Sequence, residues 1–322
     1  MIAGRHAAQA ASFGKLLAVC DIAEDKATRL ADVYAARAYG GVADLLQQEK
    51  GLDVVAVCTP NGLHAEHTIL ALRAGFHVIC EKPMAIRTAD GAAMIREAAA
   101  ADRQLFIVKQ NRFNPPVVAV KELLDAGKLG EIYSVQVNCS WNRTAAYYRD
   151  SWHGTAEMDG GILFTQFSHF IDLLYWMFGD VADVKAFTGN FAHRGQIEFE
   201  DTGVACLQFV SGAIGTLHFT INSYEKNMEG SVTIIAEKGT VKIGGQYLNE
   251  LEYQALEQGP VIAQAAGKPA NNYGFYQGSM SNHDKMYGHV ADVILRDRPN
   301  LFSGKEGLKT IEIIEKIYMA AL

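Results

Sequence analysis

Glu81-Lys82-Pro83 is the segment whose residue types most directly predict chemistry. A lysine ammonium can orient a hydroxyl or carbonyl group and stabilise the negative charge that develops on its oxygen. Pro83 fixes the backbone angle φ and has no N–H, so we expect a stiff loop around Lys82. The segment therefore predicts a reaction at a hydroxyl or carbonyl group, with Lys82 as a catalytic residue.

His169 is the second candidate catalytic residue, within the segment from Asp159 to Asp172. If this segment is one helix, Thr165, His169 and Asp172 lie on the same face. A histidine there can accept a proton from a hydroxyl group near neutral pH. An isolated histidine is more often an ordinary core residue, so the catalytic interpretation depends on combining His169 with Lys82.

The sequence before Lys82 predicts a strand, a helix and a second strand. Residues 53–58 form an apolar run typical of a buried strand, residues 62–75 have helical spacing, and residues 77–80 form the next strand. In open α/β sheets, ligands bind beyond the carboxyl ends of the strands. Because Glu81-Lys82-Pro83 follows the second strand directly, the fold itself predicts a ligand near Lys82.

The rest of the chain predicts two domains. Residues 1–110 alternate helices with strands, which indicates a doubly wound, Rossmann-like parallel sheet that binds a dinucleotide. Residues 111–322 predict an α+β domain for substrate binding and oligomerisation, with one helix over 161–178 and a β-rich region after Gly179. The polar residues 267–282 are expected to form a loop near the site or at an interface.

The first strand of the usual dinucleotide-binding fold is expected to be missing from this sequence. That fold opens with a strand and a glycine-rich turn, whose backbone receives the pyrophosphate at a helix N-terminus. This sequence begins within that helix, and Ala3 corresponds to the last small residue of the turn. A truncated record or a misassigned start codon would explain this; the alternative is a chain that folds without the strand.

The expected cofactor is NAD. Asp21 ends the second strand of the usual order, where an acidic residue accepts hydrogen bonds from the adenosine ribose and repels a 2′-phosphate, so NADP is less favoured. His64 and His67 have a spacing that could suit zinc, but no later ligand pair matches it, so no metal is expected. The cofactor-binding candidates are Ala3, Asp21, Thr59, Pro60, Asn61, His64, Glu81 and Lys82.

The expected substrate site draws on residues from both domains. Asn111 and Arg112 follow the last strand of the first domain, and an arginine suits a carboxylate or a phosphate. The aromatic and polar segment from Tyr147 to Gly154 forms either part of a sugar pocket or a loop packed by its own rings. The substrate-binding candidates are Lys82, Asn111, Arg112, Tyr148, Arg149, Trp152, Thr165, Gln166 and His169.

Composition excludes some partners. The 322 residues carry a formal net charge of −7 without a cluster of basic residues, which argues against a nucleic-acid-binding protein. No apolar stretch approaches the roughly 20 residues that span a membrane, and the start lacks a secretion signal, so we expect a cytoplasmic protein. The five cysteines lack the spacing of a metal or redox site.

Three segments in this order resemble the Gfo/Idh/MocA oxidoreductase family. They are Cys58-Thr59-Pro60-Asn61-Gly62-Leu63-His64, then Glu81-Lys82-Pro83, and later the run from Gly160 to Asp172. The resemblance covers essentially the whole chain. The resemblance implies an NAD(P)-binding Rossmann domain and a second domain with a large, mostly antiparallel open sheet that often forms oligomers. It also implies that Lys82 and His169 act on a sugar or polyol hydroxyl. Thr165 is a departure, because many members carry an aspartate there.

Residues 109–112, 148–153 and 281–285 resemble the family's dehydrogenases of nucleotide-linked sugars. The expected function is NAD-dependent oxidation of a secondary sugar hydroxyl, C3 of a UDP-linked N-acetylated uronic acid, in polysaccharide biosynthesis. One alternative is a dehydrogenase of inositol or another free polyol or sugar, and the other is a non-catalytic NAD-binding member. A homodimer or homotetramer is expected in each case.

Overall fold

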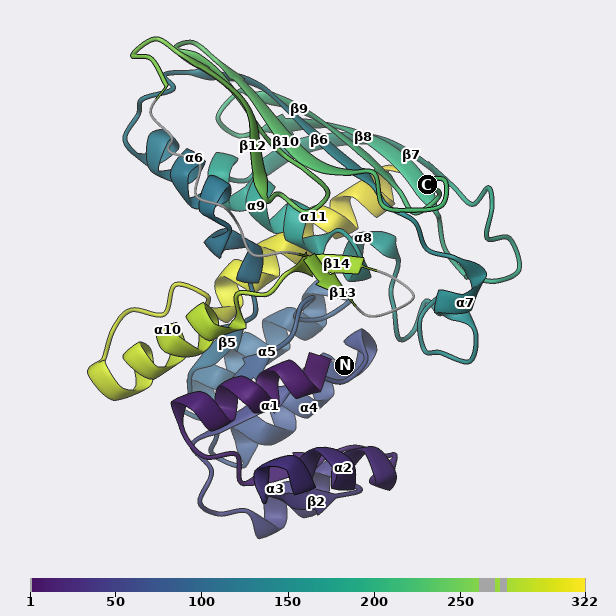
Figure 1. Cartoon of the computed structure of the whole chain (residues 1–322), viewed down its shortest axis with the longest axis vertical. Helices are drawn as coiled ribbons and strands as arrows, with labels where there is room; N and C mark the ends of the chain where they lie inside the picture. The colour runs from purple at the N-terminus through teal and green to yellow at the C-terminus, as the bar shows by residue number, and fades with distance from the viewer. Residues whose placement is uncertain (1, 261–269, 273–276, 322) are drawn as a thin grey trace. The chain divides into compact units, whose positions relative to one another are not determined.

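The computed structural model of the protein describes residues 2–260, 270–272 and 277–321 (Figure 1). The chain forms two compact units. The first comprises Met1–Val108 and His283–Leu308, and the second comprises Lys109–Asn282 and Lys309–Leu322. The sequence-based boundary at residues 110 and 111 therefore corresponds to the first crossing of the chain only, since residues 283–308 return to the first unit.

The parallel strands of the first unit form two separate sheets. The first sheet pairs β1 (Ala18–Cys20) with β2 (Arg37–Tyr39). The second has the order β3 (Val54–Val57), β4 (His77–Cys80) and β5 (Leu105–Ile107). Within the described residues, β1 has only β2 as a ladder partner, and β3 has only β4. The expected Rossmann-type parallel arrangement is confirmed, with its strands divided between two ladders.

Helices pack against these strands, and α10 (His283–Arg296) contributes to their core. Tyr287, Val290 and Val293 of α10 are buried in one cluster with Ile79 and Phe106 of β4 and β5, which explains why this late segment belongs to the first unit. The helices are α1 (Ile2–Phe13), α2 (Glu24–Tyr34), α3 (Val42–Gln48), α4 (His64–Arg73), α5 (Thr88–Ala100) and α10 (His283–Arg296), with the short 3₁₀ turn η1 (Asn61–Leu63) before α4.

The second unit contains a seven-stranded sheet, as expected from the resemblance. All neighbouring strands are antiparallel except β6 and β9, which run parallel. In spatial order the strands are β12 (Glu250–Leu256), β11 (Gly239–Gly244), β10 (Glu229–Ala236), β6 (Ile132–Ser140), β9 (Ile214–Thr220), β8 (Thr202–Phe209) and β7 (Val181–Gly189).

One face of this sheet is packed and the other is open. Along β8, Ala205, Leu207 and Phe209 are buried while the residues between them are exposed, the alternation of a sheet with one wet face. Helices α6 (Pro115–Asp125) and α9 (Ser168–Phe178) run along one face in Figure 1, as does α11 (Gly304–Ala320). Phe178 of α9 meets Phe209 with ring centroids 5.7 Å apart, so this is the core face.

The helix expected over residues 161–178 is divided in the structure. A short helix, α8 (Ile162–Thr165), precedes α9, and Phe167 between them is not helical, with φ −115° and ψ 4°. The Phe167 ring is fully buried 5.2 Å from the Trp141 ring. Burial of this ring accompanies the non-helical backbone of Phe167, which interrupts the helix. Thr165 therefore does not share a helix with His169.

Several smaller elements complete the second unit. The expected loop 267–282 contains a short hairpin of β13 (Ala270–Asn272) and β14 (Gln277–Met280), and residues 267–269 and 273–276 lie outside the described residues. The other small elements are η2 (Gln110–Phe113) and α7 (Ala145–Tyr148). In the described part of the chain, no helix is long and apolar enough to cross a membrane.

Candidate active site

The loop carrying Lys82 is held by its neighbours in the first unit. The Glu81 N–H donates to the Val57 carbonyl at 3.0 Å and extends the β3–β4 pairing by one residue. The Lys82 N–H donates to Oε2 of Glu81 at 3.0 Å. Lys82 itself is half-buried. The lysine side chain therefore starts from a backbone fixed on both sides.

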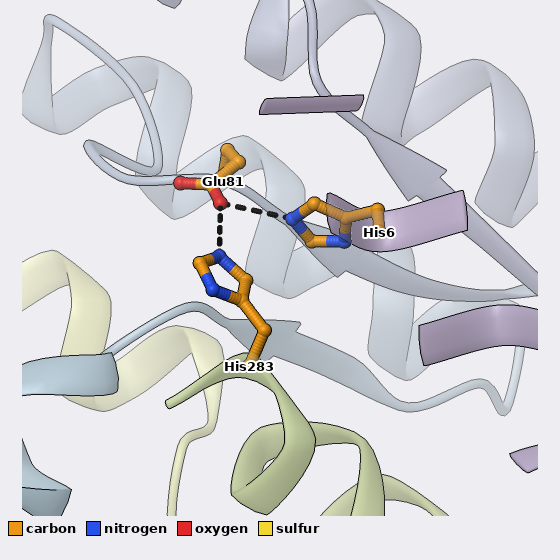
Figure 2. A group of neighbouring side chains, drawn as sticks. All are labelled: His6, Glu81 and His283. Atoms are coloured by element: carbon orange, nitrogen blue, oxygen red, sulfur yellow. Dashed lines mark hydrogen bonds and ion pairs between the residues drawn. The ribbon is translucent and has the colours of Figure 1, made fainter. Parts of the chain in front are cut away.

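Two imidazoles hold the Glu81 carboxylate (Figure 2). Nε2 of His6, on α1, lies 2.9 Å from Oε1 of Glu81, and Nε2 of His283, at the start of α10, lies 3.1 Å from the same oxygen. All three side chains are buried. Burial alone would raise the pKa of Glu81, but the hydrogen bonds from His283 and His6 outweigh it and hold that pKa well below its usual range. The carboxylate is thus an anion in a buried place.

His64 links the two loops that follow β3 and β4. Its Nδ1 lies 2.6 Å from the Pro83 carbonyl oxygen, and its Nε2 lies 2.8 Å from the Thr59 carbonyl oxygen. Burial lowers the pKa of His64, against the opposing effect of these two carbonyls. Nδ1 of His67 lies 3.1 Å from the Thr59 hydroxyl. Both ring nitrogens of His64 are engaged by backbone, so this histidine positions the loops rather than presenting a free nitrogen.

The remaining cofactor candidates, except Ala3, follow the carboxyl ends of β1 and β3. Asp21 comes directly after β1, is half-buried, and accepts a hydrogen bond from the Ala23 N–H through Oδ1 at 2.9 Å. Asn61 is buried in η1, after Thr59 and Pro60. Ala3 lies in the first turn of α1 and is half-buried. Apart from Ala3, the first unit therefore presents the expected residues at strand ends, where a dinucleotide binds in open α/β sheets.

In the second unit, His169 is buried in the first turn of α9, and Asp172 lies one turn further on. Asp172 accepts two hydrogen bonds from Arg112, Nε to Oδ2 and Nη2 to Oδ1, both 2.8 Å long. The Lys109 ammonium also contacts Oδ1 of Asp172. The Arg112 guanidinium further lies over the Trp176 ring, 4.9 Å from its centroid.

This buried group has one anion and two cations. Burial alone would raise the pKa of Asp172, but Arg112 and Lys109 outweigh it and hold that pKa far below its usual range. Since both Arg112 nitrogens named above bind Asp172, the geometry favours the exposed Arg149 over Arg112 as the partner of a substrate carboxylate.

Thr165 and Gln166 are bound within the second unit. The Thr165 hydroxyl donates to Oδ1 of Asp159. Oε1 of Gln166 accepts from Nε of Arg143 at 3.0 Å, and its Nε2 donates to the Tyr147 hydroxyl at 2.9 Å. Arg143 was not predicted to be part of this region, because an arginine after a strand has no distinctive spacing.

Some buried polar atoms of the second unit have no hydrogen-bond partner among the described residues. They include the Tyr148 hydroxyl and Oδ1 of Asn111, both on predicted substrate residues. Oγ of Ser168 and Oε1 of Gln110 share this property and were not predicted. Their positions beside His169 and Asn111 in the sequence were the only signal that could have predicted them as site residues.

Trp152, another predicted substrate residue, stacks on the His153 ring, with ring centroids 3.8 Å apart.

The predicted site residues are thus divided between the units. Lys82 and the other cofactor candidates lie in the first unit, and His169 and the remaining substrate candidates lie in the second.

Two family models match the chain. Residues 2–109 match the oxidoreductase family with an NAD-binding Rossmann fold, and residues 117–242 match the GFO/IDH/MocA C-terminal domain. The chain belongs to the Gfo/Idh/MocA oxidoreductase family. The first unit of this family member therefore contains the NAD-binding Rossmann domain, and the second contains the family's C-terminal domain.

Solved structures of the family are similar over the whole chain. The WlbA dehydrogenase from Bordetella pertussis, in complex with NADH and UDP-GlcNAcA, is 35% identical with a TM-score of 0.87, over 100% of this chain and 93% of that one. The WlbA dehydrogenase from Chromobacterium violaceum, with the same two ligands, is 35% identical with a TM-score of 0.90, over 99% of this chain and 90% of that one.

Curated relatives match over shorter stretches. A 1-carboxy-3-chloro-3,4-dihydroxycyclohexa-1,5-diene dehydrogenase from Comamonas testosteroni is 33% identical over 56% of this chain and 47% of its own length. The chain spans about half the length of the first such relatives.

Proposed function

We propose that this protein is a cytoplasmic NAD-dependent dehydrogenase that oxidises C3 of a UDP-linked N-acetylated uronic acid. The observation that carries the proposal is the similarity to two WlbA dehydrogenases, each in complex with NADH and UDP-GlcNAcA, at 35% identity over nearly the whole chain. The names of the curated relatives give several other substrates. The assignment of the sugar and of its reacting hydroxyl therefore rests on the similarity to the WlbA dehydrogenases and on the residues discussed next.

The strand ends of the first unit fit NAD. The half-buried Asp21 carboxylate can accept hydrogen bonds from the two hydroxyls of an adenosine ribose, and its charge disfavours a 2′-phosphate. Thr59, Pro60 and Asn61 follow β3, and Glu81 and Lys82 follow β4, where they would border the rest of the dinucleotide. NAD, when bound, supplies the acceptor for the hydride that leaves the sugar carbon.

Two residues carry the proton chemistry in this proposal. His169 accepts the proton of the sugar hydroxyl, and a buried histidine at the start of a helix is a suitable general base near neutral pH. Lys82 orients the hydroxyl oxygen and stabilises its developing negative charge. Thr165 has no carboxylate, and its hydroxyl donates to Oδ1 of Asp159. The proton relay therefore either ends at His169 or differs from that of members with an aspartate at this position.

The unsatisfied polar atoms of the second unit support a polar ligand. A buried hydroxyl or amide without a partner costs free energy, roughly 1–3 kcal/mol each, which a ligand hydrogen bond recovers. The Tyr148 hydroxyl and Oδ1 of Asn111 are such atoms and are suited to sugar hydroxyls and the acetamide group. Arg149, which is exposed, is the proposed partner of the uronate carboxylate.

The proposed assembly is a homo-oligomer, a dimer or a tetramer, formed through the open face of the seven-stranded sheet. Phe187 of β7 pairs with Val204 of β8 in register, and they are 80% and 44% exposed. Val204 in turn pairs with His218 of β9. Adjacent apolar side chains on a flat sheet are a common subunit interface.

Activity and NAD affinity of the Lys82→Ala variant test the catalytic proposal. NADH formation is followed with UDP-GlcNAcA, and NAD affinity is measured by calorimetry. We expect turnover to be lost with NAD affinity nearly unchanged, because Lys82 acts on the reacting oxygen. Lys26→Ala, an exposed lysine of α2, is the matched control and should behave as wild type. Equal losses of turnover and NAD affinity would sink the assigned role of Lys82.

A substrate panel separates the remaining alternatives. Preference for myo-inositol or a free sugar over UDP-GlcNAcA would replace the nucleotide-sugar assignment with a polyol dehydrogenase. Binding of NAD without oxidation of any sugar in the panel would identify a non-catalytic family member.

A further inference from the structure

The buried group of His6, Glu81 and His283 is not explained by the proposed chemistry. Its members come from α1, the loop after β4 and the start of α10, which are far apart in the sequence (Figure 2). The His6 and His283 rings meet edge to face, with centroids 5.1 Å apart. The exposed fractions are 3%, 8% and 1% for the side chains of His6, Glu81 and His283. Burial of a carboxylate is costly, so the fold maintains this group at an energetic expense.

The hydrogen bonds determine the proton positions in the group. An ionised carboxylate only accepts hydrogen bonds, so Nε2 of His6 and Nε2 of His283 both carry protons and donate to Oε1. Nδ1 of His6 lies 3.0 Å from the Tyr287 hydroxyl. In a neutral His6 ring, that nitrogen accepts from Tyr287, which selects the same tautomer. Two carboxylate oxygens thus receive three donors, the third being the Lys82 N–H on Oε2.

The contact with the Lys82 N–H connects this group to the proposed catalytic lysine. We propose that His6 and His283 are positioning residues for Lys82, because they hold the Glu81 carboxylate that in turn binds the Lys82 N–H. This inference rests on the proposed function of Lys82. Hydrogen bonds to an ionised group are about twice as strong as neutral ones, so each imidazole restrains the loop more than an ordinary polar contact would.

The same three side chains could instead bind a metal, since their ligand atoms lie within 4.8 Å of one another. Each histidine nitrogen that faces Glu81 is already paired with the carboxylate, and the Tyr287 hydroxyl and the Lys82 N–H also belong to the network. The arrangement is satisfied by protons alone, which favours the hydrogen-bonded interpretation. Metal content is therefore one outcome of the test.

The test measures the reactivity of the Lys82 amine, which requires no turnover. Trace labelling with acetic anhydride across a pH series, followed by peptide mass spectrometry, reports the exposure and the pKa of that amine. His283→Phe removes one donor to Glu81, while His283→Gln retains an N–H at similar reach. We expect His283→Phe to raise Lys82 labelling at least about tenfold, the factor that loss of one hydrogen bond to a charged group would add to loop opening.

The controls separate positioning from general destabilisation. His289→Phe makes the same change six residues further along α10, where the ring accepts from the Leu301 N–H, and it should leave Lys82 labelling as in wild type. His283→Gln should restore most of the wild-type profile. If His283→Phe does not fold, Tyr287→Phe, which removes only the hydroxyl beside His6, should change labelling in the same direction by a smaller factor.

Two results would overturn the inference. The first is an unchanged Lys82 profile in folded His283→Phe and His6→Phe proteins. The second is one zinc ion or similar metal per chain by elemental analysis, with labelling that rises on chelation. A different outcome is that the wild-type protein oxidises no sugar while the His283 and His289 variants still show the expected Lys82 labelling. That combination would refute the proposed function and leave the positioning of Lys82 intact.

Discussion

At the scale of single residues, the ionic group around Asp172 connects the α9 helix to the chain that enters the second unit. Lys109 and Arg112 stand at the start of that unit, and both bind the Asp172 carboxylate in a buried place. Such a group contributes little net stability while intact, because desolvation offsets attraction. Removing Asp172 is different, since it leaves two buried cations without their carboxylate.

Asp172→Asn should therefore lower the free energy of unfolding by about 3–5 kcal/mol, measured by urea denaturation. The matched control is Asp180→Asn, which removes a half-exposed carboxylate paired with Lys309 at 2.9 Å. Its cost should be below about 1 kcal/mol. Similar costs for the two variants would contradict the assignment of Asp172 as the anion of a buried ionic group.

Glu200 predicts a pH dependence. Burial raises its pKa to about 7, against the opposing effect of the Tyr318 hydroxyl, which donates to Oε1 at 2.7 Å. The folded state thus holds a proton that the unfolded state releases near pH 4.5. Stability should fall as pH rises from about 4.5 to about 7, by up to about 3 kcal/mol. Glu200→Gln should remove this slope in chemical denaturation at several pH values, whereas the exposed Glu198→Gln should retain it.

The candidate residues differ in how far sequence could predict them. Lys82 and His169 follow from local motifs, and Tyr148 from an aromatic segment. The partners of Glu81 could not be predicted, because His6 and His283 approach it only through tertiary packing of α1 and α10. The pairing of Arg112 with Asp172 has the same cause, and it favours Arg149 over Arg112 as the partner of the substrate carboxylate.

At the scale of elements, the start of α8 depends on Gly161, which immediately precedes it. This residue has φ +130°, and a Cβ there would lie 2.2 Å from the Tyr318 hydroxyl oxygen. That hydroxyl accepts from the Leu163 N–H at 3.1 Å, so the C-terminal helix α11 supports the first turn of α8. Close approach of a tyrosine to backbone explains why only glycine fits.

Gly161→Ala should destabilise the protein more than Gly179→Ala does. Gly179, at the end of α9, also has a positive φ of +82° but has nothing within 4 Å of the Cβ position, so it reports the backbone strain alone. We expect an additional loss of about 1–3 kcal/mol for Gly161→Ala in thermal or urea unfolding. A double-mutant cycle with Tyr318→Phe should recover part of that loss, and a cycle without coupling would contradict the contact.

Sequence patterns predicted most of the strands and helices of the first unit, because apolar runs or helical spacing bounded by Gly, Pro or Asp mark them. The helix α3 was not identified because its seven residues are too few for a periodic signal. Strand β7 was not predicted individually, because exposed Ala182 and Asp183 at its bulge interrupt the alternation. The break in the 161–178 helix depends on the burial of Phe167, which no local pattern indicates.

At the scale of the whole molecule, the open sheet face should determine the oligomeric state. Val204→Lys with Phe187→Lys places charges on neighbouring exposed positions of β8 and β7. We expect a smaller assembly than wild type by light scattering, because burying two ammonium groups without partners is costly. Leu295→Lys, which changes a 78% exposed residue of α10, is the control. An unchanged mass for the double variant would place the interface elsewhere.

The division of the first unit into two ladders affects how this unit loses its structure. Ladder hydrogen bonds join β1 to β2, β3 to β4, and β4 to β5, but within the described residues no ladder joins the first pair to the other three strands. Segments that share no ladder can open as separate cooperative units. The end carrying Asp21 would then fluctuate independently of the loop carrying Lys82. A dinucleotide that binds both the Asp21 end and the Lys82 loop would couple these fluctuations. Ordering the two ladders relative to each other would then reduce the net free energy of dinucleotide binding.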